Sequence, residues 1–279
     1  MRVVFLCLIS FLSIYAKDLV SVSIAPQAYF VKQIAKDTLD INIVIPPNAN
    51  EHTFEFKPSG ILKLEKSDIY FTANLEFEKI WILKLKDNLK NTKIISTQNG
   101  IDFIPLQEHA HEGHHHHGDD PHTWLDPLLA KTHAKNITLA LIEQYPQNKA
   151  FYEQNLENFL KEMDALNLQI QALFKNAKNK HFLVYHPSWG YFAKRYHLSQ
   201  IPVEIEGKEP KPKDLAKLAK LIQKEQIKAI FVPKGANNNT IKAMASNYNL
   251  KIIELDHLPN DYKNELLKDA KNIASVLQW

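Results

Sequence analysis

Short β-branched runs alternate with helical segments in two separate blocks, and this alternation limits the possible folds more than any other feature of the chain. The runs, which we predict to be strands, are Leu19–Ile24, Ile41–Ile45, Ile69–Thr72 and Lys93–Ser96 in the first block, and Phe182–Tyr185, Ile201–Ile205, Ala229–Val232 and Lys251–Leu255 in the second. Strands separated by helices favour parallel sheets that helices cover. We therefore expect an α/β fold with two parallel-sheet lobes of similar architecture.

One long helical pattern separates the two blocks. From Gln147 to about Lys175 no glycine or proline occurs, and apolar residues recur at steps of three and four. These apolar residues are Phe151, Leu156, Phe159, Leu160, Met163, Leu166, Ile170 and Leu173. A helix of this length would reach roughly 43 Å, enough to connect two lobes rigidly. We predict an N-terminal lobe at residues 17–126, connecting helices at 127–178 with the interlobe helix at about 147–175, and a C-terminal lobe at 179–279.

The first 16 residues are typical of a secretory signal peptide. Arg2 precedes an apolar run from Val3 to Tyr15, and the small Ala16 precedes a charged junction. The run is too short to span a bilayer. Cys7, the only cysteine, lies inside it, so the mature chain would lack disulfides and thiolate metal ligands. Any metal ligands must then be histidine or carboxylate side chains.

Charge excludes one class of partner. Loss of Arg2 would leave 33 Lys and Arg residues (34 − 1) against 31 Asp and Glu residues. This balance is near neutral, and the lysines are spread along the chain, so we expect no nucleic-acid partner.

A histidine-rich tract in mid-chain indicates metal handling. It lies between Pro105 and Pro121, in a predicted loop at residues 107–120, and contains His109, His111, His114, His115, His116 and His117. Such tracts are typical of metal collection, and we expect weak accessory binding of several ions here. The segment from His111 to His115 also matches H-E-x-x-H, but that zinc-protease chemistry needs a helix. A glycine within the motif and another directly after the tract favour a coincidence.

Four other residues are candidates for one specific metal site. His52, His186 and Asp256 each follow a predicted strand, and His122 lies in a loop that enters a helix at Asp126. Ligands of open parallel sheets bind at the carboxyl ends of the strands, so two facing lobes could bring these side chains together in a cleft. Three imidazoles and one carboxylate suit tetrahedral zinc better than manganese.

Each of these histidines also has a structural alternative. A single histidine at a strand end is more often hydrogen-bonded than metal-bound, and we interpret His133, His181 and His197 in that way. His257, next to Asp256, is interpreted as a surface neighbour or a residue behind the ligands.

The motifs around these candidates resemble the metal-binding receptors of bacterial zinc and manganese ABC importers. The resemblance rests on residues 50–59, on Asp-Pro-His122-Thr-Trp-Leu-Asp-Pro, and on His186-Pro-Ser-Trp-Gly-Tyr-Phe, with weaker support from residues 209–215 and the Leu-Asp256 pair. The histidine-rich loop is similar to that of the zinc-specific ZnuA branch. The resemblance implies two α/β lobes bridged by a rigid helix and zinc ligands at His52, His122 and His186. Asp256 or Glu51 is implied as the fourth ligand.

One segment departs from the family pattern. The strand Ala229–Val232 usually ends in Glu-Pro-Gln in such receptors, but here it continues as Pro233-Lys234-Gly235. A lysine thus replaces an acidic neighbourhood near the expected cleft.

The function expected from these observations is a periplasmic receptor that binds Zn²⁺ tightly and delivers it to an inner-membrane ABC permease with its ATPase. We expect a monomer without enzymatic activity, whose zinc binding weakens as the pH falls through about 6.5. The alternatives are a manganese or iron receptor of the same family, a secreted zinc hydrolase with Glu51 as general base, and a metal-buffering surface protein.

Overall fold

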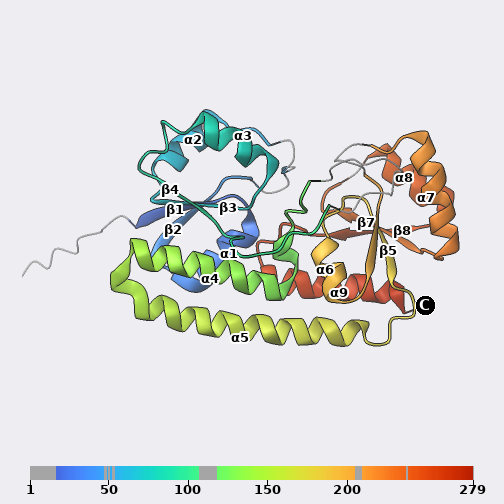
Figure 1. Cartoon of the computed structure of the whole chain (residues 1–279). Helices are drawn as coiled ribbons and strands as arrows, with labels where there is room; N and C mark the ends of the chain where they lie inside the picture. Colours follow the sequence, from blue (N-terminus) through green and yellow to red (C-terminus); the bar gives the residue numbers. More distant parts are fainter. Residues whose placement is uncertain are drawn as a thin grey trace, which may run out of the picture.

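The computed structural model describes residues 17–46, 49, 51, 54–106, 118–204, 209–236 and 238–278, so the predicted signal peptide lies outside the described residues. Two four-stranded parallel sheets form the centres of two lobes (Figure 1). The strands are β1 (Asp18–Val22), β2 (Leu39–Ile43), β3 (Ile69–Thr72) and β4 (Lys93–Ser96) in the first sheet, and β5 (His181–Val184), β6 (Ser199–Pro202), β7 (Ala229–Pro233) and β8 (Lys251–Leu255) in the second. All the predicted strands are confirmed, each within three residues of its expected bounds.

The two sheets share one topology. Their strand orders are β2-β1-β3-β4 and β6-β5-β7-β8, so in each lobe the chain starts in an inner strand, moves to one edge and then crosses to the other side. The strands pair in register at buried apolar positions, as Val20 does with Ile69 and Leu183 with Ile230. Parallel strands that helices cover are apolar over most of their length, which explains the β-branched runs in the sequence.

Helices cover the sheets and join the lobes. They are α1 (Ala25–Ala35), α2 (Pro58–Glu65), α3 (Glu76–Lys84), α4 (Pro127–Gln144), α5 (Lys149–Phe174), α6 (Gly190–Arg195), α7 (Pro212–Lys224), α8 (Asn239–Tyr248) and α9 (Tyr262–Leu277), with short 3-10 turns η1 (Thr123–Leu125) and η2 (Pro146–Asn148). Helices α2 and α3 lie above the first sheet, whereas α4, α5 and α9 form a layer beneath the molecule (Figure 1). Among the described residues, no helix has both the length and the apolar content needed to cross a bilayer.

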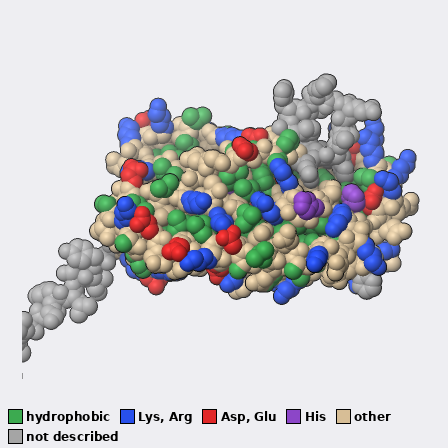
Figure 2. Space-filling view, turned by 60° about the horizontal axis from the view of Figure 1, so that its bottom comes forward, with side chains coloured by type: hydrophobic (Ala, Val, Ile, Leu, Met, Phe, Trp, Pro, Cys, Tyr) green, Lys and Arg blue, Asp and Glu red, His purple; other side chains and the backbone are tan. Residues whose placement is uncertain are grey.

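Helix α5 is the predicted interlobe helix. Its 26 residues span about 39 Å, and it runs beneath both lobes (Figure 1). Its buried stripe consists of Tyr152, Phe159, Met163, Leu166, Ile170 and Phe174. Phe151, which we expected in this stripe, is 44% exposed, because the buried face begins one residue later, at Tyr152. On the face of the molecule that includes this layer, acidic and basic side chains are interspersed (Figure 2).

The hydrophobic core continues from one lobe into the other. One cluster of buried side chains includes Val20 of the first sheet, Phe159 of α5, Phe182 of the second sheet and Tyr262 of α9. Phe30 of α1 contacts both Phe159 and Tyr262, with ring centroids 5.6 and 4.9 Å apart. The helix layer therefore fixes the two sheets relative to each other and limits how far the lobes can separate.

A hydrogen-bonded ion pair also links the helix layer to the second lobe. Asp126 caps the N-terminus of α4 by accepting from the backbone N–H of Leu128 at 2.8 Å. The same carboxylate accepts from Arg195 of α6, at 2.9 Å from Nε and 2.8 Å from Nη2. Asp126 is nearly completely buried, so these partners are needed to balance its charge. The predicted cap at Asp126 is confirmed.

Candidate metal centre

His122 lies in the segment that connects the first lobe to α4, directly before η1. Its side chain is fully buried, and its Nδ1 lies 2.7 Å from Asp120 Oδ1. A carboxylate can only accept, so Nδ1 carries the proton and donates it to Asp120. In the neutral ring the lone pair is then on Nε2, which is the atom that faces the cleft. Asp120 also accepts from the backbone N–H of His122 at 2.9 Å, which fixes the orientation of the ring.

His186 has the same arrangement in the second lobe. It follows the carboxyl end of β5, and its Nδ1 lies 2.8 Å from Glu204 Oε2, beyond the neighbouring strand β6. The ring is 8% exposed. By the same argument Nδ1 donates to the carboxylate and Nε2 is left to bind a ligand. A carboxylate behind each imidazole is typical of histidine metal sites.

Glu51 lies between these two rings. Its Oε1 is 3.6 Å from His122 Nε2, 3.7 Å from His186 Nε2 and 3.1 Å from His257 Nε2. Glu51, His122 and His186 offer donor atoms that all lie within 4.8 Å of one another, and all three are buried. The structure thus brings residues from both lobes, which are far apart in the sequence, into one donor group.

The electrostatics of this group favour one proton on His122. Burial alone would lower the pKa of His122, but the charge and hydrogen bond of Asp120, together with Glu51, raise it to about 9. Burial lowers the pKa of His186 to about 3, and the attraction of Glu51 does not compensate. Burial would raise the pKa of Glu51, but His257, His122 and His186 hold it well below its usual value. At neutral pH Glu51 is therefore ionised, His122 is protonated and His186 is neutral.

Asp256 and His257 follow the carboxyl end of β8 and face different partners. The Asp256 carboxylate accepts from the backbone N–H of Leu258 at 3.1 Å and lies 3.4 Å from Lys234 Nζ. His257, which we interpreted as a surface neighbour or a residue behind the ligands, directs Nε2 at Glu51. Of this adjacent pair, the imidazole of His257 contacts the donor group, at Glu51.

The remaining candidates divide into two sets. His52 lies outside the described residues, as do His109, His111, His114, His115, His116 and His117, so their predicted roles stay predictions. Of the histidines that we interpreted as structural, His133 is fully buried and lies 2.8 Å from the hydroxyl groups of both Thr97 and Thr123. Its interpretation as a hydrogen-bonded residue is confirmed.

Sequence reasoning missed two residues at this centre, Asp120 and Glu204. Asp120 stands two positions before His122, a spacing that allows a carboxylate to reach both the backbone and the ring of the histidine. Glu204 lies just beyond β6, the strand that neighbours β5, and its position could be found only from the parallel register. No local pattern distinguishes His257 from Asp256 as the residue that points inward.

The chemistry of the donor group suits a borderline divalent cation. Neutral imidazoles and one carboxylate are zinc ligands, with bonds of about 2.0–2.2 Å. Ligand atoms around a tetrahedral zinc with such bonds lie about 3.4 Å apart. Glu51 Oε1 is 3.6 Å from His122 Nε2 and 3.7 Å from His186 Nε2, so only small movements are needed to close these contacts around an ion. The site is buried and is built from residues of both lobes.

The family model described as ZnuA, zinc-uptake complex component A, periplasmic, matches residues 20–276. The chain belongs to the ZnuA family. It is 30% identical over 250 residues to the high-affinity zinc uptake system protein ZnuA of Bacillus subtilis, covering 86% of this chain and 78% of that protein.

Further similarities agree with this family. The chain is 27% identical over 264 residues to the zinc-binding lipoprotein AdcA of Streptococcus pneumoniae, covering 91% of this chain but 52% of AdcA, so it spans about half of that protein. A solved structure of zinc-bound ZnuA with residues 138–173 deleted is 32% identical, covers 95% of this chain and 99% of its own, and superposes with a TM-score of 0.88. The fold expected from the resemblance is confirmed.

Proposed function

We propose that this chain is a zinc-binding receptor that captures Zn²⁺ in the interlobe cleft and delivers it to an inner-membrane ABC permease with its ATPase. One observation carries the proposal: Glu51, His122 and His186 come from both lobes and form a single buried donor group. The carboxylates of Asp120 and Glu204 behind the two imidazoles orient the Nε2 atoms of both rings toward Glu51. The zinc-related names of the family and its relatives agree with this donor set.

The preference for zinc follows from the ligand types. Imidazole suits zinc, nickel and copper, whereas manganese prefers a larger share of oxygen ligands. His52 adds a further imidazole in the proposal, because it directly follows Glu51 in the chain. Export through a cleaved signal peptide at residues 1–16 and a monomeric state in the periplasm belong to the same proposal. The histidine-rich loop is proposed to collect ions, with much weaker affinity for each ion than the cleft.

The hydrolase alternative is less well supported by the site. It needs Glu51 as a general base, and an efficient base has a pKa close to the working pH. The imidazoles around Glu51 instead hold its pKa well below the usual value, despite its burial. Such a carboxylate is suited to bind a cation and poorly suited to remove a proton. We therefore propose a transport receptor without enzymatic activity.

A chelator-competition zinc titration tests the proposed site. We would compare the full chain, a chain without residues 109–117, and the His186→Ala variant of each. One tight site that survives loop deletion and is lost in His186→Ala is the expected result. His181→Ala is a matched control, because His181 lies at the start of β5 and pairs with Glu225 at 3.6 Å, away from the donor group. Loss of all tight binding with the loop alone would refute the cleft assignment and support a metal-buffering protein.

A further inference from the structure

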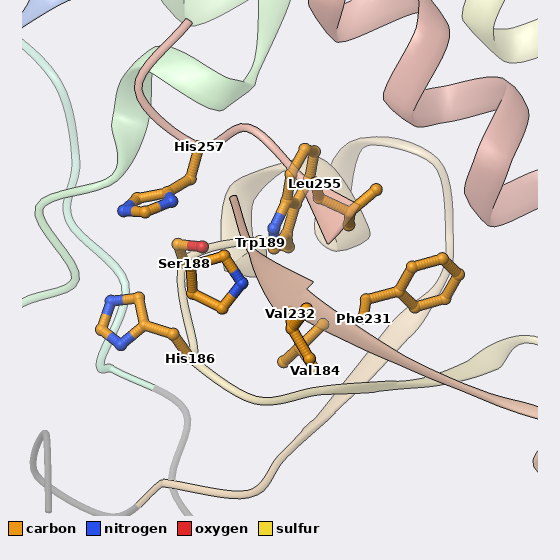
Figure 3. Close-up of a pocket in the computed structure, with 9 residues that line it drawn as sticks. Val184, His186, Ser188, Trp189, Phe231, Val232, Leu255 and His257 are labelled. Atoms are coloured by element: carbon orange, nitrogen blue, oxygen red, sulfur yellow. The ribbon is translucent and has the colours of Figure 1, made fainter. Parts of the chain in front are cut away.

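The imidazole of His257 contacts Glu51 of the donor group and stands one residue after Asp256, the fourth ligand that the family resemblance implies. Its Nε2 lies 3.1 Å from Glu51 Oε1, the shortest of the three imidazole distances to that oxygen. The ring centroid is 5.7 Å from that of His186 and 6.5 Å from that of His122. Figure 3 shows His186 and His257 on the same side of the pocket, with their rings turned away from Val184, Val232 and Leu255.

The backbone around His257 is held by buried partners. Trp124 Nε1 donates to the carbonyl oxygen of His257 at 2.7 Å, and Tyr262 Oη donates to the carbonyl oxygen of Trp124 at 2.6 Å. On the other side, Asp269 accepts from the backbone N–H of Asp256 at 2.8 Å. Trp124 and Tyr262 are fully buried, and Trp124 belongs to the same short segment as His122. The turn that carries His257 is therefore fixed relative to a proposed ligand of the other lobe.

The Asp256 carboxylate is used within its own turn. One oxygen accepts from the backbone N–H of Leu258, and the other lies 3.4 Å from Lys234 Nζ. Lys234 stands in the segment where the chain departs from the family pattern. Its side chain is 58% exposed, so the ion pair itself is weak. The backbone hydrogen bond is the stronger constraint, because it closes the turn that directs the next side chain, His257, toward Glu51.

We propose that His257 is a zinc ligand of this chain and that Asp256 is not. The inference rests on the zinc-receptor function proposed above and assigns one further residue to its site. The Nε2 atom that donates to Glu51 loses that proton, either to solvent or to Nδ1 of the same ring, and its lone pair then binds the ion. An imidazole in place of a carboxylate strengthens the preference for zinc, nickel or copper over manganese. His257 is thus a residue that determines metal specificity.

X-ray absorption at the zinc edge, combined with chelator competition, tests this assignment on the full chain. With less than one equivalent of zinc, the tight site fills first, and the scattering reports the number of imidazoles bound. His257→Gln keeps a donor for Glu51 but removes the imidazole. We expect it to lower the imidazole number by one and to weaken zinc binding at least tenfold. Asp256→Asn should preserve the imidazole number and the oxygen scattering, with affinity within about threefold of the unchanged chain.

The opposite pattern would overturn the inference. If His257→Gln leaves the imidazole number and affinity unchanged, while Asp256→Asn removes an oxygen ligand and weakens binding, Asp256 is the ligand. His197→Asn, at an exposed histidine, is the matched control. Thermal unfolding without zinc checks that each variant folds. If His257→Gln does not fold, His257→Asn replaces it. Absence of a tight site in the unchanged chain would refute the receptor function itself, which distinguishes the two failures.

Discussion

Zinc binding is expected to release a proton from His122 at any pH below about 9. In the absence of zinc, Asp120 and Glu51 overcome the effect of burial and raise the pKa of this imidazole to about 9. Zinc needs the unprotonated Nε2, so the proton must leave when the ion enters. His186, with a pKa near 3, and Glu51, with its lowered pKa, are already unprotonated at neutral pH. Zinc affinity should therefore rise with pH up to about 9. The ordinary histidine pKa of about 6.5 would instead predict that the affinity levels off above that pH.

The size of the effect follows from the distance between the pH and this pKa. At pH 7, two units below the pKa of His122, the protonated ring weakens apparent zinc affinity by about 100-fold, or roughly 3 kcal/mol. At pH 8 the penalty is about tenfold, and at pH 9 about twofold. The apparent dissociation constant should therefore fall by about tenfold between pH 7 and pH 8, with one proton released per zinc from this residue.

Chelator-competition titrations at half-unit steps from pH 6.5 to 9 measure this dependence, after correction for the chelator's own protonation. Calorimetry in two buffers of different ionisation enthalpy counts the released protons. The Asp120→Asn variant should shift the pH dependence to lower pH, because it removes the charge that raises the pKa of His122. An affinity that changes less than twofold between pH 7 and pH 8.5 would refute the reasoning, since His122 would then be neutral before zinc binds.

Three further outcomes are expected. Burial lowers the pKa of His133 to about 3, so its contribution to stability is complete above pH 6.5 and is lost as the pH falls toward 3. Between pH 7 and pH 4.5, the free energy of unfolding measured in urea should drop by about 3 kcal/mol more than in His133→Gln. An equal drop in both proteins would contradict this. Asp126→Ala removes a helix cap and a buried ion-pair partner and should cost roughly 3 kcal/mol in the same assay, whereas Lys161→Ala, at an exposed pair, should change little. A Cβ at Gly190 would lie 2.5 Å from a carboxylate oxygen of Asp120, the residue behind the His122 ring. Gly190→Ala should therefore weaken zinc binding 10- to 100-fold in competition titrations. Gly60→Ala, whose Cβ would lie 3.7 Å from its nearest neighbour, should leave zinc binding unchanged.

The fold could be predicted from the sequence because its signals are local. The strand Ile69–Thr72 is buried along its whole length, and short β-branched and aromatic runs spaced by helical segments are typical of such strands. The interlobe helix was predicted from its apolar spacing. Of its expected apolar stripe, Phe151 is exposed, whereas Leu156, Leu160 and Leu173 are half-buried. Phe151 and Tyr152 are adjacent aromatic residues near the start of α5, and which of the two is buried depends on how α1 packs against this helix.

The site could be predicted only in part, because its geometry depends on contacts between distant segments. His122 and His186 stand next to strand ends and helix starts, which position ligands in any open α/β sheet. Glu51 was named as a possible ligand, and the structure places it at the centre of the described group. Our proposal that His257 and not Asp256 is a ligand rests on the hydrogen bond from Leu258 to Asp256 and on the contact of Asp256 with Lys234, and a strand pattern reveals neither.

The division of the core into two clusters has a consequence for hydrogen exchange. One cluster joins both lobes through the helix layer, whereas the second is confined to the outer part of the second lobe, around Leu183, Leu218, Ile230 and Met244. Amides in α7 and α8 depend only on this smaller cluster, so they can open and exchange without breaking the shared core. Zinc bound between the lobes should slow exchange in η1 and at the ends of β5 and β8, while α7 and α8 continue to exchange at nearly their original rates.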